Sequence, residues 1–183
     1  MRRRLTNSGF TIIELVIAIM VIGIIGAVAA SRLIGADAFD LIAAREQIVS
    51  ILRMAQQRAI GHQDVVVTLQ PSGDDLVISL EDSAGNLISP VTTALPAGLL
   101  SADVDVLASC STPPDSDNVA TDDKPLHVEF DALGDLMIGG VVDGTPAYPV
   151  DVTTGMRICL NNDPVMSICI SAAGFAYTGN CDA

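Results

Sequence analysis

Residues 9–30 read GFTIIELVIAIMVIGIIGAVAA, and this stretch sets the organisation of the whole chain of 183 residues. From Phe10 to Ala30 only Glu14 carries a charge. At about 1.5 Å of rise per residue, a helix over this segment is roughly 30 Å long, the thickness of the hydrocarbon core of a bilayer. Residues 10–30 therefore predict a helix that can cross a membrane.

Three arginines, Arg2 to Arg4, precede this segment. Basic residues beside a membrane helix stay in the cytoplasm, so everything after Ala30 is expected on the periplasmic side. The same features also fit a secretory signal, with an apolar region from Leu15 to Gly26 and a cleavage site at residues 27–29. In that alternative the mature chain is a secreted soluble binding protein without the apolar segment.

The run from Gly9 to Leu15, Gly-Phe-Thr-Ile-Ile-Glu-Leu, resembles the cleavage and methylation signal of type IV pilins and of the pseudopilins of type II secretion. The resemblance implies that a prepilin peptidase removes residues 1–9 as a leader, cutting after Gly9, and methylates Phe10. It implies a non-enzymatic structural subunit whose partners are other pilin or pseudopilin subunits, the peptidase and an inner-membrane assembly platform. The expected location is the bacterial inner membrane, single-pass with a periplasmic C-terminal domain, and then the pilus or pseudopilus.

Glu14 is unusual in an apolar helix, because a carboxylate there costs about 2.5 to 3.5 kcal/mol at the bilayer centre and less near the interface. Cleavage after Gly9 creates an ammonium at Phe10. If Glu14 pairs with the Phe10 ammonium of a neighbouring subunit, each charge offsets the burial of the other. This pairing predicts that Glu14 is an assembly residue.

Residues 31–61 predict an amphipathic second half of the same helix, ending near Gly61. Many major pilins carry a proline where this chain has Ser31, so any kink here has to come from glycines. Apolar residues recur at helical spacing on one face, and polar residues line the other: Leu41, Ala44, Ile48, Leu52, Ala55 and Ala59 against Glu46, Ser50, Arg53 and Gln57.

Residues 62–183 predict an acidic, β-rich globular domain. Short runs rich in Val and Ile, separated by Gly, Pro, Asn and Asp, predict strands at 64–70, 75–81, 126–130, 135–139, 155–160, 167–171 and 175–178. Hairpins are expected through the turns at 132–134 and 172–174. The predicted fold class is α+β and pilin-like, with a long N-terminal helix packed on an antiparallel β-sheet.

Four cysteines lie in this domain, in no CxxC motif and with no histidine nearby in sequence: Cys110, Cys159, Cys169 and Cys181. An even number in a periplasmic domain favours disulfides over a zinc site. Four cysteines allow three pairings. We favour Cys159 with Cys169 and Cys110 with Cys181, because the first two fall on strands expected to be adjacent.

Scattered residues resemble the minor-pilin branch that contains type II secretion pseudopilin H. They are residues 51–60 followed by 64–69, the Phe130 to Gly134 spacing, and residues 168–174. Phe39 and Asp40, together with the cysteines, resemble the minor pilin of mannose-sensitive haemagglutinin type pili. This resemblance implies a minor subunit.

Charge and motifs exclude several classes of function. The net charge is −13. The segment beyond Gly61 contains 18 acidic residues and only two basic ones, Lys124 and Arg157. Such a domain disfavours nucleic-acid binding and therefore a DNA-uptake minor pilin, the rival within the family. His62 and His127 belong to no nucleophile motif, and His127 is expected to face solvent. We therefore expect neither an enzyme nor a cofactor.

The polar loop at 111–124 holds Asp115, Asp117 and Asn118, whose oxygens are of the type that binds Ca²⁺. The loop lacks the fixed spacing of a calcium-binding loop. We assign no metal site to the chain.

Overall fold

The computed structural model describes residues 11–33, 36–61, 64–82, 84–95, 98–105, 110, 118–142, 150–179 and 181. The chain divides into two compact units, Met1–Asp37 and Ala38–Ala183, each with its own internal contacts. We describe each unit by itself.

The helical part consists of α1 (Ile12–Leu33) and α2 (Ala36–Ala59). The sequence predicted one continuous helix from residue 10 to residue 61, whereas the structure describes two. Residues 34 and 35 between them, and the leader residues 1–9, lie outside the described residues.

The amphipathic pattern predicted for α2 is confirmed. All six predicted apolar positions are buried, five of them completely, and the four predicted polar positions are exposed. After the helix, Gly61 takes a left-handed φ of +75°, and its N–H donates to the carbonyl of Ala132 (3.0 Å). Glycine adopts this conformation without the steric cost of a Cβ, which suits a helix end.

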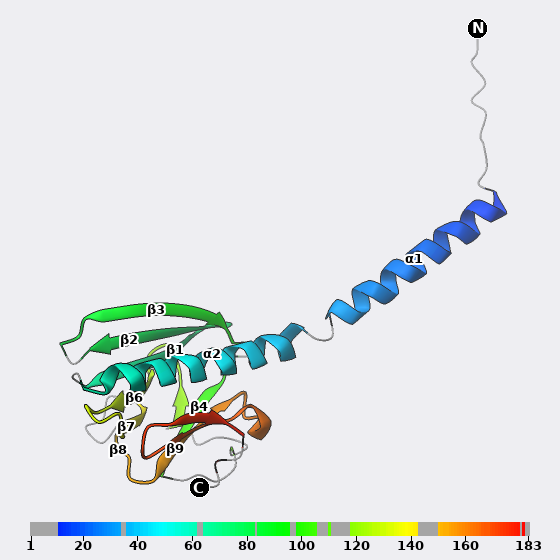
Figure 1. Cartoon of the computed structure of the whole chain (residues 1–183). Coiled ribbons are helices and arrows are strands. Elements are labelled where there is room, and N and C mark those ends of the chain that lie inside the picture. Colours follow the sequence, from blue (N-terminus) through cyan, green and yellow to red (C-terminus); the bar gives the residue numbers. More distant parts are fainter. Residues whose placement is uncertain are drawn as a thin grey trace. The chain divides into compact units, whose positions relative to one another are not determined.

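The larger sheet has six antiparallel strands in the order β3-β2-β1-β6-β7-β8. Figure 1 shows β1, β2 and β3 as long neighbouring strands beside α2. The bounds are β1 (Val65–Ser72), β2 (Asp75–Asp82), β3 (Leu87–Ala94), β6 (Leu126–Phe130), β7 (Leu136–Val141) and β8 (Val150–Asp151).

The smaller sheet has five antiparallel strands in the order β11-β10-β9-β4-β5. Its bounds are β4 (Leu100–Val104), β5 (Val119–Ala120), β9 (Gly155–Leu160), β10 (Ile168–Ser171) and β11 (Ala176–Thr178), and the short 3-10 helix η2 (Pro164–Met166) joins β9 to β10. The expectation of a single sheet is therefore corrected to two. All seven predicted strands exist, and both predicted hairpins are confirmed, β6 with β7 and β10 with β11.

One apolar core joins α2 to both sheets. Ile48 and Leu52 of the helix are fully buried, as are Leu69 and Phe130 of the larger sheet and Ile158 of the smaller one. At the end of α2 the side chain of Gln56 donates to the carbonyls of Gly134 (3.2 Å) and Ala173 (2.8 Å), one from each sheet. The helix thus holds the two sheets in one unit.

Disulfides join Cys110 to Cys159 and Cys169 to Cys181, and no cysteine is free. The pairing that we favoured from the sequence was wrong. Although β9 and β10 are adjacent, their register places Cys169 opposite Arg157 rather than opposite Cys159. Each of these two cysteines therefore bonds to a cysteine outside the strand pair. Cys159 bonds to Cys110, which precedes β5, and Cys169 bonds to Cys181, which follows β11.

Candidate functional site

Two residues of the N-terminal signal, Thr11 and Glu14, are joined by hydrogen bonds at the start of α1. The N–H of Glu14 donates to the Thr11 side-chain oxygen (3.3 Å) and to the Thr11 carbonyl (3.1 Å). A threonine that accepts a bond from the third residue of a helix is an N-cap, and Thr-x-x-Glu has the spacing of a capping box. Thr11 and Glu14 therefore begin the helix as well as belonging to the signal.

Glu14 is exposed in the first turn of α1, where the positive end of the helix dipole favours a carboxylate. It makes no ion pair with any residue that the structure describes. The other two predicted signal residues, Gly9 and Phe10, lie outside the described residues. The pairing of Glu14 with a neighbouring ammonium stays a prediction.

From Leu15 to Ala30, α1 is apolar on every side. All the described side chains from Thr11 to Ile25 are exposed within this single chain. A helix that is apolar all round is normally buried in protein or lipid. We therefore expect protein or lipid to cover this surface. The large exposed apolar residues are Ile12, Ile13, Leu15, Val16, Ile17, Ile19, Met20, Val21, Ile22, Ile24 and Ile25.

Within the ranges that the structure describes, no helix is both long and apolar enough to cross a membrane.

The alternation predicted for β6 is confirmed, with Leu126, Val128 and Phe130 fully buried. His127, expected to face solvent, is instead half-buried. Burial lowers its pKa, and the nearby Glu81 partly opposes this effect. Glu129 is also half-buried, and burial followed by the charge of Asp64 raises its pKa. His62 lies outside the described residues.

The polar loop offers no described metal centre. Asn118 donates its amide to the carboxylate of Asp103 (3.1 Å), while Asp115 and Asp117 lie outside the described residues. Over the described part of the chain, no group of three or more His, Cys, Asp or Glu residues is placed to hold a metal ion.

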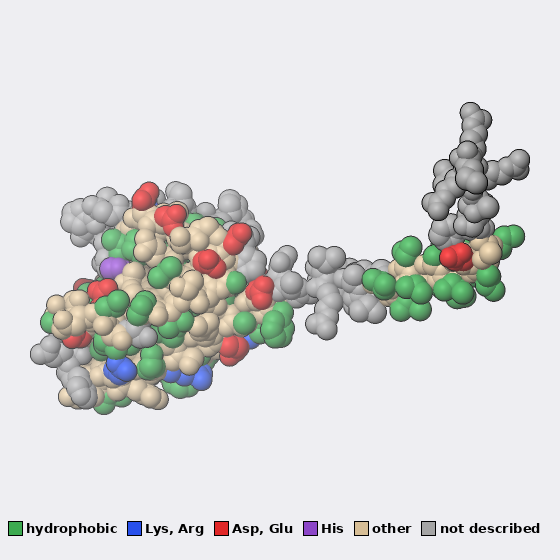
Figure 2. Space-filling model, turned by 90° about the horizontal axis from the view of Figure 1, so that it is seen from above, with side chains coloured by type: hydrophobic (Ala, Val, Ile, Leu, Met, Phe, Trp, Pro, Cys, Tyr) green, Lys and Arg blue, Asp and Glu red, His purple; other side chains and the backbone are tan. Residues whose placement is uncertain are grey.

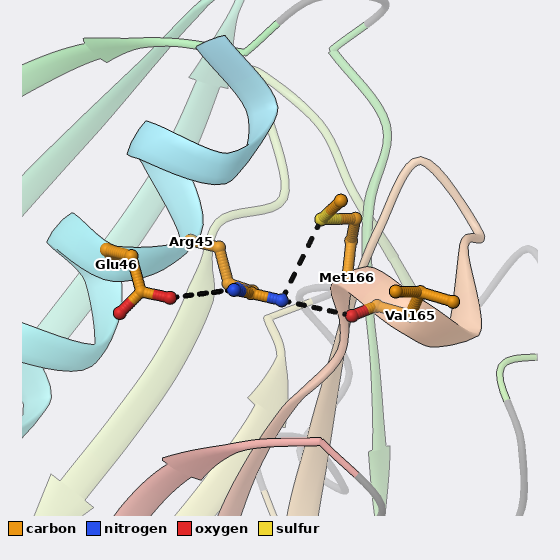
Figure 3. Close-up of polar contacts among 4 residues, drawn as sticks. All are labelled: Arg45, Glu46, Val165 and Met166. Carbon is orange, nitrogen blue, oxygen red and sulfur yellow. Dashed lines mark hydrogen bonds and ion pairs between the residues drawn. The ribbon is translucent and has the colours of Figure 1, made fainter. Parts of the chain in front are cut away.

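Sequence reasoning missed a polar cluster beside the start of α2, shown in Figure 3. Arg45 forms an ion pair with Glu46 (2.7 Å), and the same guanidinium donates to the carbonyl of Val165 (3.1 Å) and contacts the sulfur of Met166 (3.9 Å). Arg45 and Val165 are 120 residues apart. No local pattern could have predicted this contact between α2 and η2.

A second missed cluster lies near the end of α2. The Arg53 side chain donates to the carbonyl of Ala176 (2.9 Å), and its guanidinium carbon is 5.3 Å from the centre of the Phe175 ring. The rings of Phe175 and Tyr177 stack at 6.2 Å. The sequence signals only that Arg53 lies on the polar face of the helix.

Comparison with known families matches residues 4–30 to the prokaryotic N-terminal methylation motif. The matched span covers the end of the basic leader, the predicted cleavage site and most of α1. This prepilin-type signal supports the type IV pilin and pseudopilin family and implies processing by a prepilin peptidase and assembly with other pilin subunits. It also indicates a protein that is first anchored in a membrane and then associated with a pilus. No match emerged among the curated proteins or the solved structures.

Proposed function

We propose that this chain is a non-enzymatic, minor structural subunit of a type IV pilus or of a related type II secretion pseudopilus. The observation that carries the proposal is a prepilin-type signal leading directly into a helix that is apolar on every side and exposed in the single chain. In the assembled filament, α1 helices of neighbouring subunits cover one another. Before assembly, residues 10–30 hold the subunit in the inner membrane, single-pass, with the second unit in the periplasm.

Minor status and the branch that contains pseudopilin H rest on the resemblances at residues 51–60, 64–69, 130–134 and 168–174. Two disulfides suit an oxidising periplasm, where such bonds persist. The proposal includes cleavage after Gly9, methylation of Phe10 and a role of Glu14 in assembly. It also includes the absence of catalytic activity.

The intact mass of the mature chain tests the proposal directly. A subunit processed by prepilin peptidase starts at a methylated Phe10, whereas the secreted alternative starts at Ala30. Both masses are well resolved for a chain of this size. A mature protein that starts at Ala30 would refute the filament subunit and establish the secreted binding protein.

The DNA-uptake rival is tested by a mobility shift with duplex DNA at physiological salt. Beyond Gly61, the part of the chain that the structure describes holds two cations, of which Arg157 is buried and Lys124 is half-buried. DNA affinity grows with the number of phosphates that cations neutralise, so no shift is expected. A shift that persists at physiological salt would favour the uptake role.

A further inference from the structure

β3 (Leu87–Ala94) is a long edge strand of the larger sheet, and Figure 1 shows it as the outer strand of that sheet. The strands that the structure describes end in three further edges, all of them short: β5 and β8 have two residues each and β11 has three. Long edges are normally protected by charged side chains, and β3 carries none. Its outer side is therefore a place where another strand can pair.

The register of β3 shows which of its backbone groups face outward. In an antiparallel strand, residues that exchange hydrogen bonds with the neighbouring strand alternate with residues whose N–H and C=O groups point away from it. The N–H of Leu95 donates to the carbonyl of Asp74 (2.7 Å), so these two residues form a bonded pair. The alternation then directs the backbone groups of Pro90, Thr92 and Ala94 away from β2. Pro90 fits this pattern, because its missing N–H would have faced outward.

These outward groups are available to a partner. The N–H groups of Thr92 and Ala94 donate to no residue that the structure describes, and Pro90, Thr92 and Ala94 are all exposed. When an extended peptide adds to the edge of a sheet, main-chain hydrogen bonds to such groups provide the affinity. We call the outward side of residues 90–94 the β3 edge.

The apolar core is only partly covered behind the β3 edge. Ile88 and Val91 of β3 pack against the core but are partly buried, whereas Ile78 and Leu80 of β2, one strand further in, are 1% exposed. Alternate residues of a strand face the same side of a sheet. Apolar side chains at every second position of an added strand would therefore complete the cover of Ile88 and Val91.

The strands around the β3 edge are acidic. Residues 64–95 contain five acidic residues and no basic one. Asp75 lies opposite Ala94 and Glu81 lies opposite Leu87, so both ends of β3 have a carboxylate of β2 beside them. Figure 2 looks down on the side of the second unit on which β3 lies in Figure 1, and acidic side chains are spread over it. This charge favours a basic partner.

The basic residues of the second unit all lie outside β1, β2 and β3: Arg45, Arg53, Arg58, Lys124 and Arg157. Arg157 is buried, and Arg45 is paired with Glu46 (2.7 Å). The negative charge around the β3 edge is therefore not neutralised from within its own three strands.

We propose that the β3 edge binds an extended, basic segment of another protein, which adds to the larger sheet as a further strand. In this segment apolar side chains alternate with lysine or arginine. The apolar side chains cover Ile88 and Val91, the basic ones face the carboxylates of β2, and the backbone pairs with Thr92 and Ala94. A second copy of this chain does not fit, because pairing β3 with β3 brings two acidic surfaces together. The contact is independent of the role of the chain in a filament.

Binding of a synthetic peptide to the purified full chain in a nonionic detergent tests the proposal. The probe is a fluorescently labelled peptide as long as β3 in which valine and lysine alternate. One control peptide has glutamate in place of lysine, and the other has the same composition with the valines and lysines in separate blocks. The alternating valine–lysine peptide should bind several-fold more tightly than either control. Equal binding of all three peptides, or none, would overturn the proposal.

Amide hydrogen exchange of the full chain, followed by NMR, locates the contact. In the chain alone, the amides of Val91 and Thr93 should exchange slowly because they are bonded to β2, while those of Thr92 and Ala94 exchange fast. The valine–lysine peptide should protect Thr92 and Ala94. Binding without this protection would overturn strand addition, since attraction between charges would then explain it. Protection of the same two amides without peptide, rising with protein concentration, would show a second copy at the edge and also overturn the proposal.

The variant Thr92→Pro removes one outward N–H without removing a bond to β2, and a proline is tolerated at an edge. It should bind the valine–lysine peptide several-fold more weakly than the matched control Thr92→Val, which keeps the N–H. A second variant, Asp75→Asn with Glu81→Gln, leaves the backbone unchanged and should weaken both the binding and its dependence on salt. Unchanged binding in this charge variant, or equal binding in the two Thr92 variants, would overturn the proposed contact.

Discussion

Gly174 and Gly134, from the turns of two hairpins in different sheets, lie in contact, with the carbonyl oxygen of Gly134 in the space that a Cβ on Gly174 would fill. Gly174 also has a left-handed φ of +74°, and the amide of Gln56 donates to the Gly134 carbonyl. This contact joins the larger sheet, the smaller sheet and the end of α2 at one point. A side chain at residue 174 would force the sheets apart.

Gly174→Ala is therefore expected to destabilise the second unit by about 3 kcal/mol or more, because it adds a backbone overlap to the cost of about 1 to 2 kcal/mol for a left-handed non-glycine residue. Chemical denaturation of residues 38–183 measures the effect. Gly85→Ala is the matched control, since Gly85 has φ +76° and open space around it. Equal losses in the two variants would show that the contact with Gly134 contributes nothing.

Residues 38–183 are expected to fold without α1 and to contain no free thiol. Thiol titration of the denatured, unreduced protein checks this, and proteolysis with mass spectrometry should recover Cys110 linked to Cys159 and Cys169 linked to Cys181. Peptides that link Cys159 to Cys169 would contradict the structure.

The two disulfides should differ in their effect on stability. Cys110 and Cys159 are 49 residues apart, while Cys169 and Cys181 are 12 apart. Loop-closure entropy predicts losses of about 4 kcal/mol and about 3 kcal/mol when each pair is replaced by alanine. Denaturation of the two double variants tests this order. A larger loss for the shorter loop would contradict the entropic explanation.

Asp105 should make stability depend on pH. Burial tends to raise the pKa of this carboxylate, but hydrogen bonds from Thr154 and Thr153 outweigh burial and lower the pKa to about 2. Because the folded pKa is the lower one, the stabilisation is complete above about pH 4 and disappears as the pH falls toward 2. Asp105 is exposed, so solvent screening limits the effect to roughly 1 kcal/mol.

Asp105→Asn tests this dependence without straining the backbone, since asparagine tolerates the left-handed φ of 56° at this position. The variant should be less stable than the natural chain at pH 6, and the two curves should converge near pH 2. Asp151→Asn is the control, because Asp151 is exposed and its carboxylate accepts no hydrogen bond from any described residue. A constant difference between pH 6 and pH 2 would rule out ionisation of Asp105 as the cause.

The variant Glu14→Gln distinguishes a segment that only anchors the chain from one in which Glu14 takes part in assembly. If the segment only anchored the chain, loss of the charge would ease insertion and leave function intact. If Glu14 pairs with the Phe10 ammonium of a neighbour, the variant should still be cleaved after Gly9 but should fail to enter filaments. The broken buried pair costs roughly 3 to 5 kcal/mol. The amount of subunit in sheared filaments, at native expression, is the measurement, and normal incorporation would refute the pairing.

Local pattern predicted seven of the eleven strands that the structure describes and missed β3, β4, β5 and β8. β6 and β9 have the predicted bounds, because alternating or continuous Val, Ile and Leu runs are bounded by turn residues. β3 went unpredicted because Pro90 and several hydroxyl residues interrupt it. It forms as an edge strand by pairing with β2, and a proline is tolerated at an edge. β5 and β8 have two residues each and exist only through their partners.

By itself, the sequence determined the N-terminal signal, the apolar run behind it, the buried stripe of α2, the acidic character of the second unit and most of its strands. Each of these follows from residues close together in the chain. The tertiary structure alone decided that the strands form two sheets, that Cys169 lies opposite Arg157, and that Gly174 meets Gly134. These depend on register and packing between residues tens of positions apart, which the whole core sets and no local preference specifies.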